Sequence, residues 1–126
     1  MRRTALTLWG PFLAALALVF WLSSLSDVPG SRHFWDKAIH AFIYAGLGVL
    51  ALRAFHGGFT EPRPAPTLLA ASAVILWGVS DEFHQSFVPG RDASGWDVLA
   101  DAIGFAVAVG VVALLTRRSA RPACPR

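Results

Sequence analysis

The chain has 126 residues, of which 55% are hydrophobic and only 15% charged, and its formal net charge is +3. This composition is too apolar for an ordinary soluble domain and is typical of an integral membrane protein. The basic residues are not interleaved with aromatic residues in a polar surface, so we expect no nucleic-acid partner. The single cysteine, Cys124, cannot form a disulfide within the chain.

Four apolar segments, at about 4–25, 36–55, 66–87 and 97–116, are each close to the roughly 20 residues that cross a bilayer as a helix. We therefore predict an all-α, polytopic membrane protein, a bundle of four transmembrane helices that forms one domain over residues 1–126. The segment 56–66 contains glycines and prolines that interrupt a helix. The N-terminus imitates a secretory signal, but its apolar stretch is long, so we expect an uncleaved first helix.

The basic residues predict the orientation of these helices. Lysine and arginine in short loops favour the cytoplasmic side of a membrane. With four helices, one side receives Arg2, Arg3, Arg53, Arg63, Arg117, Arg118, Arg121 and Arg126, and the other only Arg32, Lys37 and Arg91. Both termini are therefore expected in the cytoplasm, with residues 117–126 as a basic tail. The expected first partner of the chain is the lipid bilayer.

The third apolar segment becomes polar before it is long enough to span. Its uninterrupted apolar run, Leu68 to Val79, has 12 residues, or about 18 Å of helix, against a hydrocarbon core of about 30 Å. A spanning helix must therefore continue through SDEFHQ, residues 80–85. Charged groups at this depth are costly, so they should face the bundle interior or a wet cavity, which is typical of functional sites.

Three segments each carry polar or titratable side chains on one helical face near this depth. Residues three or four apart lie on one face of a helix. The faces carry Asp36, His40 and Tyr44 in the second segment, Asp81, Glu82, His84 and Gln85 in the third, and Asp97 and Asp101 in the fourth. Gly104 and Ala108 continue the last face and allow a neighbouring helix to approach closely.

The segment VPGR, which follows the third apolar segment, predicts a tight turn. Pro89 and Gly90 fit the two central positions of a type II turn, which would fold Arg91 back over the helix ends. A guanidinium there either offsets the clustered carboxylates or holds an anionic ligand, and the sequence leaves both open.

These residues together resemble the VanZ-like family, small membrane proteins named for an accessory factor of teicoplanin resistance in bacteria. The matching positions are Asp36, Lys37, His40 and Tyr44, then Asp81, Glu82, Gln85, Phe87, Pro89 and Arg91, then Asp97, Asp101 and Gly104. LSSLS, residues 22–26, is also similar to the end of that family's first helix. The resemblance runs from about Ser23 to Gly104. The family often has Asn where this chain has Asp101, which adds a carboxylate here.

The resemblance implies a multi-pass protein of the bacterial cytoplasmic membrane that is linked to the cell envelope and glycopeptide susceptibility. We expect an outward-facing polar pocket that binds an envelope-related, lipid-linked or cell-wall ligand. The expected ligand-binding residues are Asp36, Lys37, His40, Tyr44, Asp81, Glu82, Gln85, Arg91, Asp97 and Asp101. Oligomers are possible, because Ala45 with Gly48, or Gly104 with Ala108, could pack against a second copy or within the fold.

Two other functions stay open. The pocket could catalyse hydrolysis or group transfer on a lipid-linked or phosphorylated substrate, with Asp81, Glu82 or His40 as the candidate catalytic residues and Arg91 or Lys37 as an anion clamp. It could also be a structural or proton-handling network. Whether the chain is an enzyme is therefore left open. His40, His84 and the carboxylates could bind a metal, but no H-E-x-x-H motif is present, so we expect neither metal nor cofactor.

Overall fold

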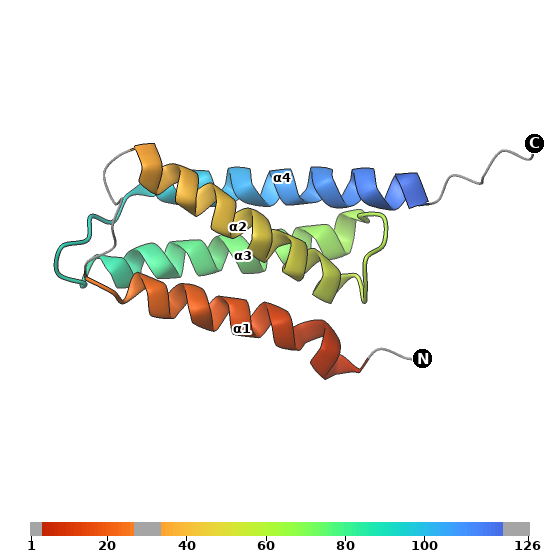
Figure 1. Cartoon of the computed structure of the whole chain (residues 1–126), viewed down its shortest axis with the longest axis horizontal. Helices are drawn as coiled ribbons and strands as arrows, with labels where there is room; N and C mark the ends of the chain where they lie inside the picture. Colours follow the sequence, from red (N-terminus) through yellow and green to blue (C-terminus); the bar gives the residue numbers. More distant parts are fainter. Residues whose placement is uncertain (1–3, 27–33, 120–126) are drawn as a thin grey trace, which may run out of the picture.

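The computed structural model describes residues 4–26 and 34–119. They form four helices: α1 (Ala5–Ser23), α2 (Phe34–Phe55), α3 (Pro64–Gln85) and α4 (Gly95–Ser119). The helices lie side by side and alternate in direction, so that α1 begins at the end of the bundle where α4 ends (Figure 1). The predicted all-α fold is confirmed, and each predicted segment corresponds to one helix with ends shifted by a few residues.

Three of the helices, α1, α2 and α4, contain stretches long and apolar enough to cross a membrane: Ala5–Ser23, Lys37–Phe55 and Gly95–Ser119. In α3, the last turns carry the polar residues of SDEFHQ, which lower its mean hydropathy. Large apolar side chains cover the outer surface of the bundle, such as Leu6, Phe42 and Leu114, which are 79%, 82% and 59% exposed. Such a surface is suited to lipid rather than to water.

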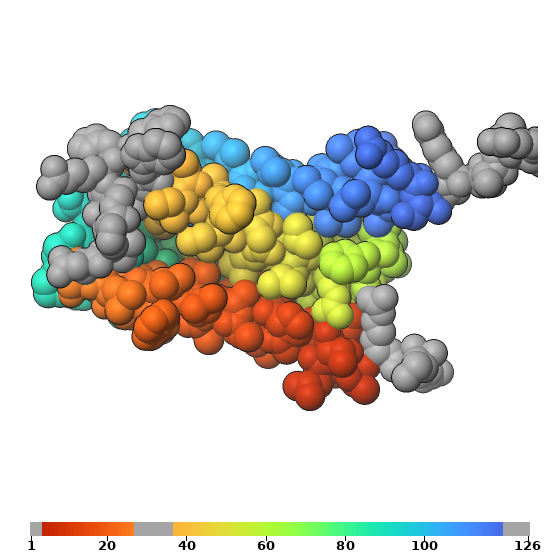
Figure 2. Space-filling model, viewed as in Figure 1, coloured from red at the N-terminus to blue at the C-terminus, as the bar shows by residue number. Residues whose placement is uncertain are grey.

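The helix α2, like α3, contacts each of the other three helices. In the space-filling view it lies between α1 and α4 (Figure 2). Its closest neighbour is α4, where a side chain on Gly104 would collide with the carbonyl oxygen of Ala41. A side chain on Gly48 would come within 2.9 Å of Ala108. The small residues singled out in the sequence therefore pack α2 against α4 within the fold.

The connection between α2 and α3 is held by a buried histidine. Gly57 adopts a φ of 73°, and the Gly58 amide donates to the Arg53 carbonyl at 2.9 Å, which is a Schellman helix end. The imidazole of His56 accepts a hydrogen bond from the Arg63 amide at 3.0 Å through Nε2, and its Nδ1 lies 2.9 Å from the Leu52 carbonyl oxygen. These contacts join the end of α2 to the start of α3.

The helix α3 begins at Pro64 and ends at Gln85, two residues earlier at each end than predicted. Proline fits the first turn of a helix because its missing N–H has no partner there. At the other end, Ser86 and Phe87 continue into a turn, and the Phe87 amide donates to the carbonyl of His84 at 3.1 Å rather than to the carbonyl four residues back.

Candidate functional site

Buried polar side chains gather at one end of the bundle, where α1 and α3 end and α2 and α4 begin (Figure 1). Among the described residues, this end holds the buried Ser23, Asp81, Glu82, Gln85, Asp97 and Asp101. The other buried polar residue, His56, belongs to the α2–α3 connection at the opposite end. Because buried carboxylates are costly unless they are paired, this concentration defines the candidate site.

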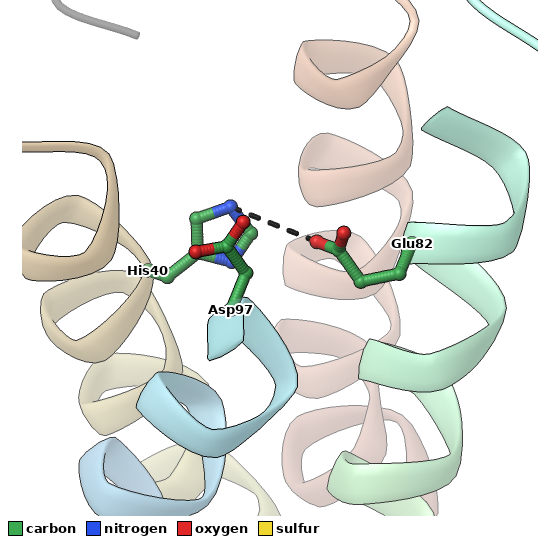
Figure 3. A group of neighbouring side chains, drawn as sticks. All are labelled: His40, Glu82 and Asp97. Carbon is green, nitrogen blue, oxygen red and sulfur yellow. Dashed lines mark ion pairs between the residues drawn. The ribbon is translucent and has the colours of Figure 1, made fainter. Parts of the chain in front are cut away.

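The imidazole of His40 lies at the centre of the site, between carboxylates from two other helices. Its Nδ1 is 3.0 Å from Oδ1 of Asp101, which belongs to α4 and is fully buried. Its Nε2 is 3.9 Å from Oε1 of Glu82, which reaches toward the ring from α3 (Figure 3). His40, Glu82 and Asp97 each offer one possible metal-ligand atom, and these atoms lie within 4.8 Å of one another.

Two contacts position Asp97 and Glu82 beside the histidine. The ammonium group of Lys37, which is 42% exposed, lies 3.2 Å from Oδ1 of the buried Asp97. Oε2 of Glu82 accepts a hydrogen bond at 2.8 Å from the backbone amide of Ser94, the residue just before α4. The start of α4 is thereby attached to α2 through an ion pair and to α3 through a carboxylate.

A second group of contacts joins α1 to α3. The hydroxyl of Ser23 donates to Oδ2 of Asp81 at 2.6 Å, and the side-chain amide of Gln85 donates to the same oxygen at 3.1 Å. The hydroxyl of Ser24, the residue after Ser23, lies 3.0 Å from Nε2 of His84. His84 therefore faces α1, as Asp81 does, and not the His40 cluster.

A cavity of about 170 Å³ lies beside these groups. Its polar lining consists of Ser23, His40, Tyr44, Asp81, Gln85 and Arg91, and the rest is apolar and comes from α1 and α2. The cavity thus brings together residues of all the predicted polar faces except that of α4. Its size suits a small polar group or a few water molecules, not a whole lipid.

The predicted turn at Pro89 and Gly90 is confirmed. The Arg91 amide donates to the Val88 carbonyl at 3.2 Å, and Gly90 has a φ of 81°, as the third position of a type II turn requires. The Arg91 guanidinium donates to the carbonyl of Leu22 in α1 at 3.3 Å. Among the side chains that the structure describes, which do not include that of Asp36, it forms no ion pair with a carboxylate.

Several buried polar atoms of the site have no hydrogen-bond partner among the residues that the structure describes. They are Tyr44 Oη, Asp81 Oδ1, Glu82 Oε1, Arg91 Nε and Asp101 Oδ2. A further such atom, Trp77 Nε1, belongs to a residue that packs against the hydrophobic core. Native proteins satisfy nearly all such atoms, and an unsatisfied one costs about 1–3 kcal/mol. Unsatisfied atoms gathered at one place indicate a site that binds a polar molecule or an ion.

The structure brings together most of the side chains singled out from the sequence. Asp36 lies in α2, but its side chain is outside the described residues. Tyr44 lies parallel to His40, with ring centroids 6.3 Å apart, and its hydroxyl does not donate to Asp81. Asp97 and Asp101 lie on the buried face of α4, as their spacing predicts.

Sequence reasoning missed two groups that position the site. Ser23 belongs to LSSLS, which was noted only as a helix end, and the backbone amide of Ser94 carries no sequence signal at all. Chemically, the carboxylates and the imidazole can exchange protons with a bound group or hold a cation, while Arg91 offers a donor to an anion. No family model, curated protein or solved structure matches the chain.

Proposed function

We propose that the chain is a VanZ-like integral membrane protein of the bacterial cytoplasmic membrane, with four spanning helices and both termini in the cytoplasm. Three helices suited to crossing a membrane support this. The outer surface of α3 supports its inclusion as the fourth, because Leu68, Leu76 and Phe83 are 69%, 68% and 68% exposed along nearly its whole length. The excess of arginine at the proposed inner side supports the orientation.

We further propose that the cavity beside His40 and Asp81 faces the outer side and binds a polar group of an envelope ligand. The observation that carries this proposal is the cavity itself, lined by the buried Asp81 and Gln85 and the partly buried His40, and bordered by polar atoms that have no partner among the described residues. A purely structural network would be expected to satisfy its own buried atoms. The link to teicoplanin rests on the sequence resemblance alone.

A second candidate is an intramembrane hydrolase or transferase that acts on a lipid-linked or phosphorylated substrate. The unpartnered oxygens Asp81 Oδ1 and Glu82 Oε1 favour it, since either carboxylate could take a proton from a bound hydroxyl or water. Arg91 lines the cavity and has a buried, unpartnered Nε, which suits an anionic group such as a phosphate.

The test uses Asp81→Asn in a bacterial host, with the exposed Asp92→Asn as the matched control. We would measure membrane abundance, melting temperature in detergent and teicoplanin susceptibility together. A ligand-binding role predicts that Asp81→Asn changes susceptibility while abundance and melting temperature stay near those of Asp92→Asn. A fall in abundance or melting temperature with no separate effect on susceptibility would instead assign Asp81 to the fold.

A further inference from the structure

The cluster around His40 has the arrangement of a metal site. Three different helices supply its donors, His40 from α2, Glu82 from α3 and Asp97 from α4, and their ligand atoms lie within 4.8 Å of one another (Figure 3). An imidazole nitrogen with two carboxylate oxygens is a common donor set for zinc and other divalent transition metals. Three protein ligands also leave one position open in a tetrahedral site.

The gap between His40 and Glu82 is too long for a hydrogen bond and suits two ligands of one ion. Nε2 and Oε1 are 3.9 Å apart. Two ligand atoms that are each about 2.1 Å from a zinc ion lie about 3.4 Å apart at the tetrahedral angle, so a small side-chain movement closes the difference. Glu82 is only 7% exposed, and its Oε1 has no hydrogen-bond partner among the described residues.

The groups behind the proposed ligands have the roles that metal sites require. Asp101 Oδ1 lies 3.0 Å from Nδ1 of His40, an arrangement in which a carboxylate orients a metal-binding imidazole and presents Nε2 to the ion. The Ser94 amide holds Oε2 of Glu82 at 2.8 Å and leaves Oε1 for the ion. Lys37 contacts only Oδ1 of Asp97, so that carboxylate keeps a second oxygen for another partner.

The local charge also favours a cation. Four carboxylates of the site are buried: Asp81, Glu82, Asp97 and Asp101. Within the part of the chain that the structure describes, the basic side chains that pair with them are His40 and Lys37. Buried charge without compensation is strongly unfavourable in a membrane protein. A divalent cation at His40 and Glu82 would supply the missing positive charge.

We propose that His40, Glu82 and Asp97 bind a divalent transition-metal ion, with Zn²⁺ as the simplest fit, and that Asp101 positions the histidine. A hard ion such as Mg²⁺ or Ca²⁺ fits less well, because the imidazole is a poor ligand for it. The site departs from the metal-free protein expected from the sequence. It depends neither on the identity of an envelope ligand nor on the resemblance to the VanZ-like family.

The test measures zinc binding by the full chain, purified in detergent through a tag without histidine. The protein is stripped with a chelator and titrated with ZnCl₂, and metal content and melting temperature are recorded. We expect saturable, stoichiometric zinc that raises the melting temperature. Glu82→Gln should weaken zinc binding by at least about tenfold. Its matched control is Glu61→Gln, the same exchange at an exposed residue that pairs with Arg117.

A second variant protects the test against a folding defect. If Glu82→Gln does not accumulate, Asp97→Asn removes a ligand beside the half-exposed Lys37, and Asp92→Asn is its exposed control. The proposal is overturned if the wild-type protein shows no saturable zinc binding, or if the ligand variants bind zinc as tightly as their controls. In that case His40 is a structural group that is held by Asp101. Because zinc binding is measured directly, the outcome for the metal site does not depend on whether the protein affects teicoplanin susceptibility.

Discussion

Ser23, the last residue of α1, donates a hydrogen bond to Asp81 of α3 at 2.6 Å, and both side chains are buried. The Ser23 hydroxyl also lies 2.8 Å from the Val19 carbonyl oxygen of its own helix, so a single hydroxyl proton serves two acceptors. This contact links α1 to the polar site, because Asp81 also accepts from Gln85 and lines the cavity.

Ser23→Ala should therefore destabilise the bundle by about 1 kcal/mol, since it leaves Oδ2 of Asp81 with only Gln85 as a donor. The measurement is the melting temperature or denaturant midpoint in detergent. The control is Ser24→Ala, which removes a hydroxyl from an exposed residue on the same helix end. Equal losses of stability in both variants would show that the buried contact to Asp81 stabilises the bundle no more than the exposed hydroxyl does.

Tyr44→Phe tests whether the cavity exists for a ligand. Tyr44 is 1% exposed, and its hydroxyl has no partner among the residues that the structure describes. Removing an unsatisfied buried hydroxyl should leave the melting temperature unchanged or raise it. If the hydroxyl contacts a bound ligand, the same variant should reduce the effect of the protein on teicoplanin susceptibility. A melting temperature well below that of the wild type would instead reveal a structural partner for this hydroxyl.

The close approach of α2 and α4 predicts different effects on stability when two glycines of α4, Gly104 and Gly110, are replaced by alanine. A methyl group on Gly104 would collide with the carbonyl oxygen of Ala41 and lie 2.9 Å from the Ala45 nitrogen. Gly104→Ala should therefore separate the helices and cost about 1–3 kcal/mol. Gly110→Ala, where nothing lies within 4 Å, should be neutral or gain up to about 1 kcal/mol from helix propensity. Thermal unfolding of both variants decides the matter.

Periodicity predicted the parts of the structure that are local in sequence. The buried face of α4 with Asp97, Asp101 and Gly104 follows from helical spacing, because one face must carry all the residues that a neighbouring helix contacts. The turn at Gly90 follows from a backbone angle that glycine adopts without strain. Both are consequences of rules that act within a few residues.

Partners across helices could not be predicted in the same way. The turn was expected to fold Arg91 over the helix ends, but its partner there, the Leu22 carbonyl of α1, could not be read from the sequence. Which carboxylate meets His40 depends on how α2, α3 and α4 are rotated against each other, and the close contact at Gly104 involves only α2 and α4. The sequence shows the polar faces, whereas the pairing depends on packing.

Asp101→Asn tests the positioning role that we assign to Asp101 in the proposed metal site. The carboxylate is fully buried and contacts Nδ1 of His40. Replacing it with an amide should lower zinc affinity about 10- to 100-fold, because the amide orients the imidazole less strongly. Zinc titration of the purified protein gives the measurement. Asp92→Asn, the same exchange at an exposed residue, is the control and should bind zinc within a few-fold of the wild type.

The proposal that α3 crosses the membrane can be tested at its two ends. Thr60 precedes α3 and Ala93 follows it, and both are exposed. In a chain carrying Cys124→Ser, the single variants Thr60→Cys and Ala93→Cys would be treated with a membrane-impermeant maleimide. A spanning α3 predicts that Ala93→Cys is labelled in intact spheroplasts and Thr60→Cys only after lysis, because the arginine-rich ends belong in the cytoplasm. Labelling of both from outside would mean that α3 does not cross the membrane. Labelling of Thr60→Cys alone from outside would place the polar end of the bundle in the cytoplasm, opposite to our proposal.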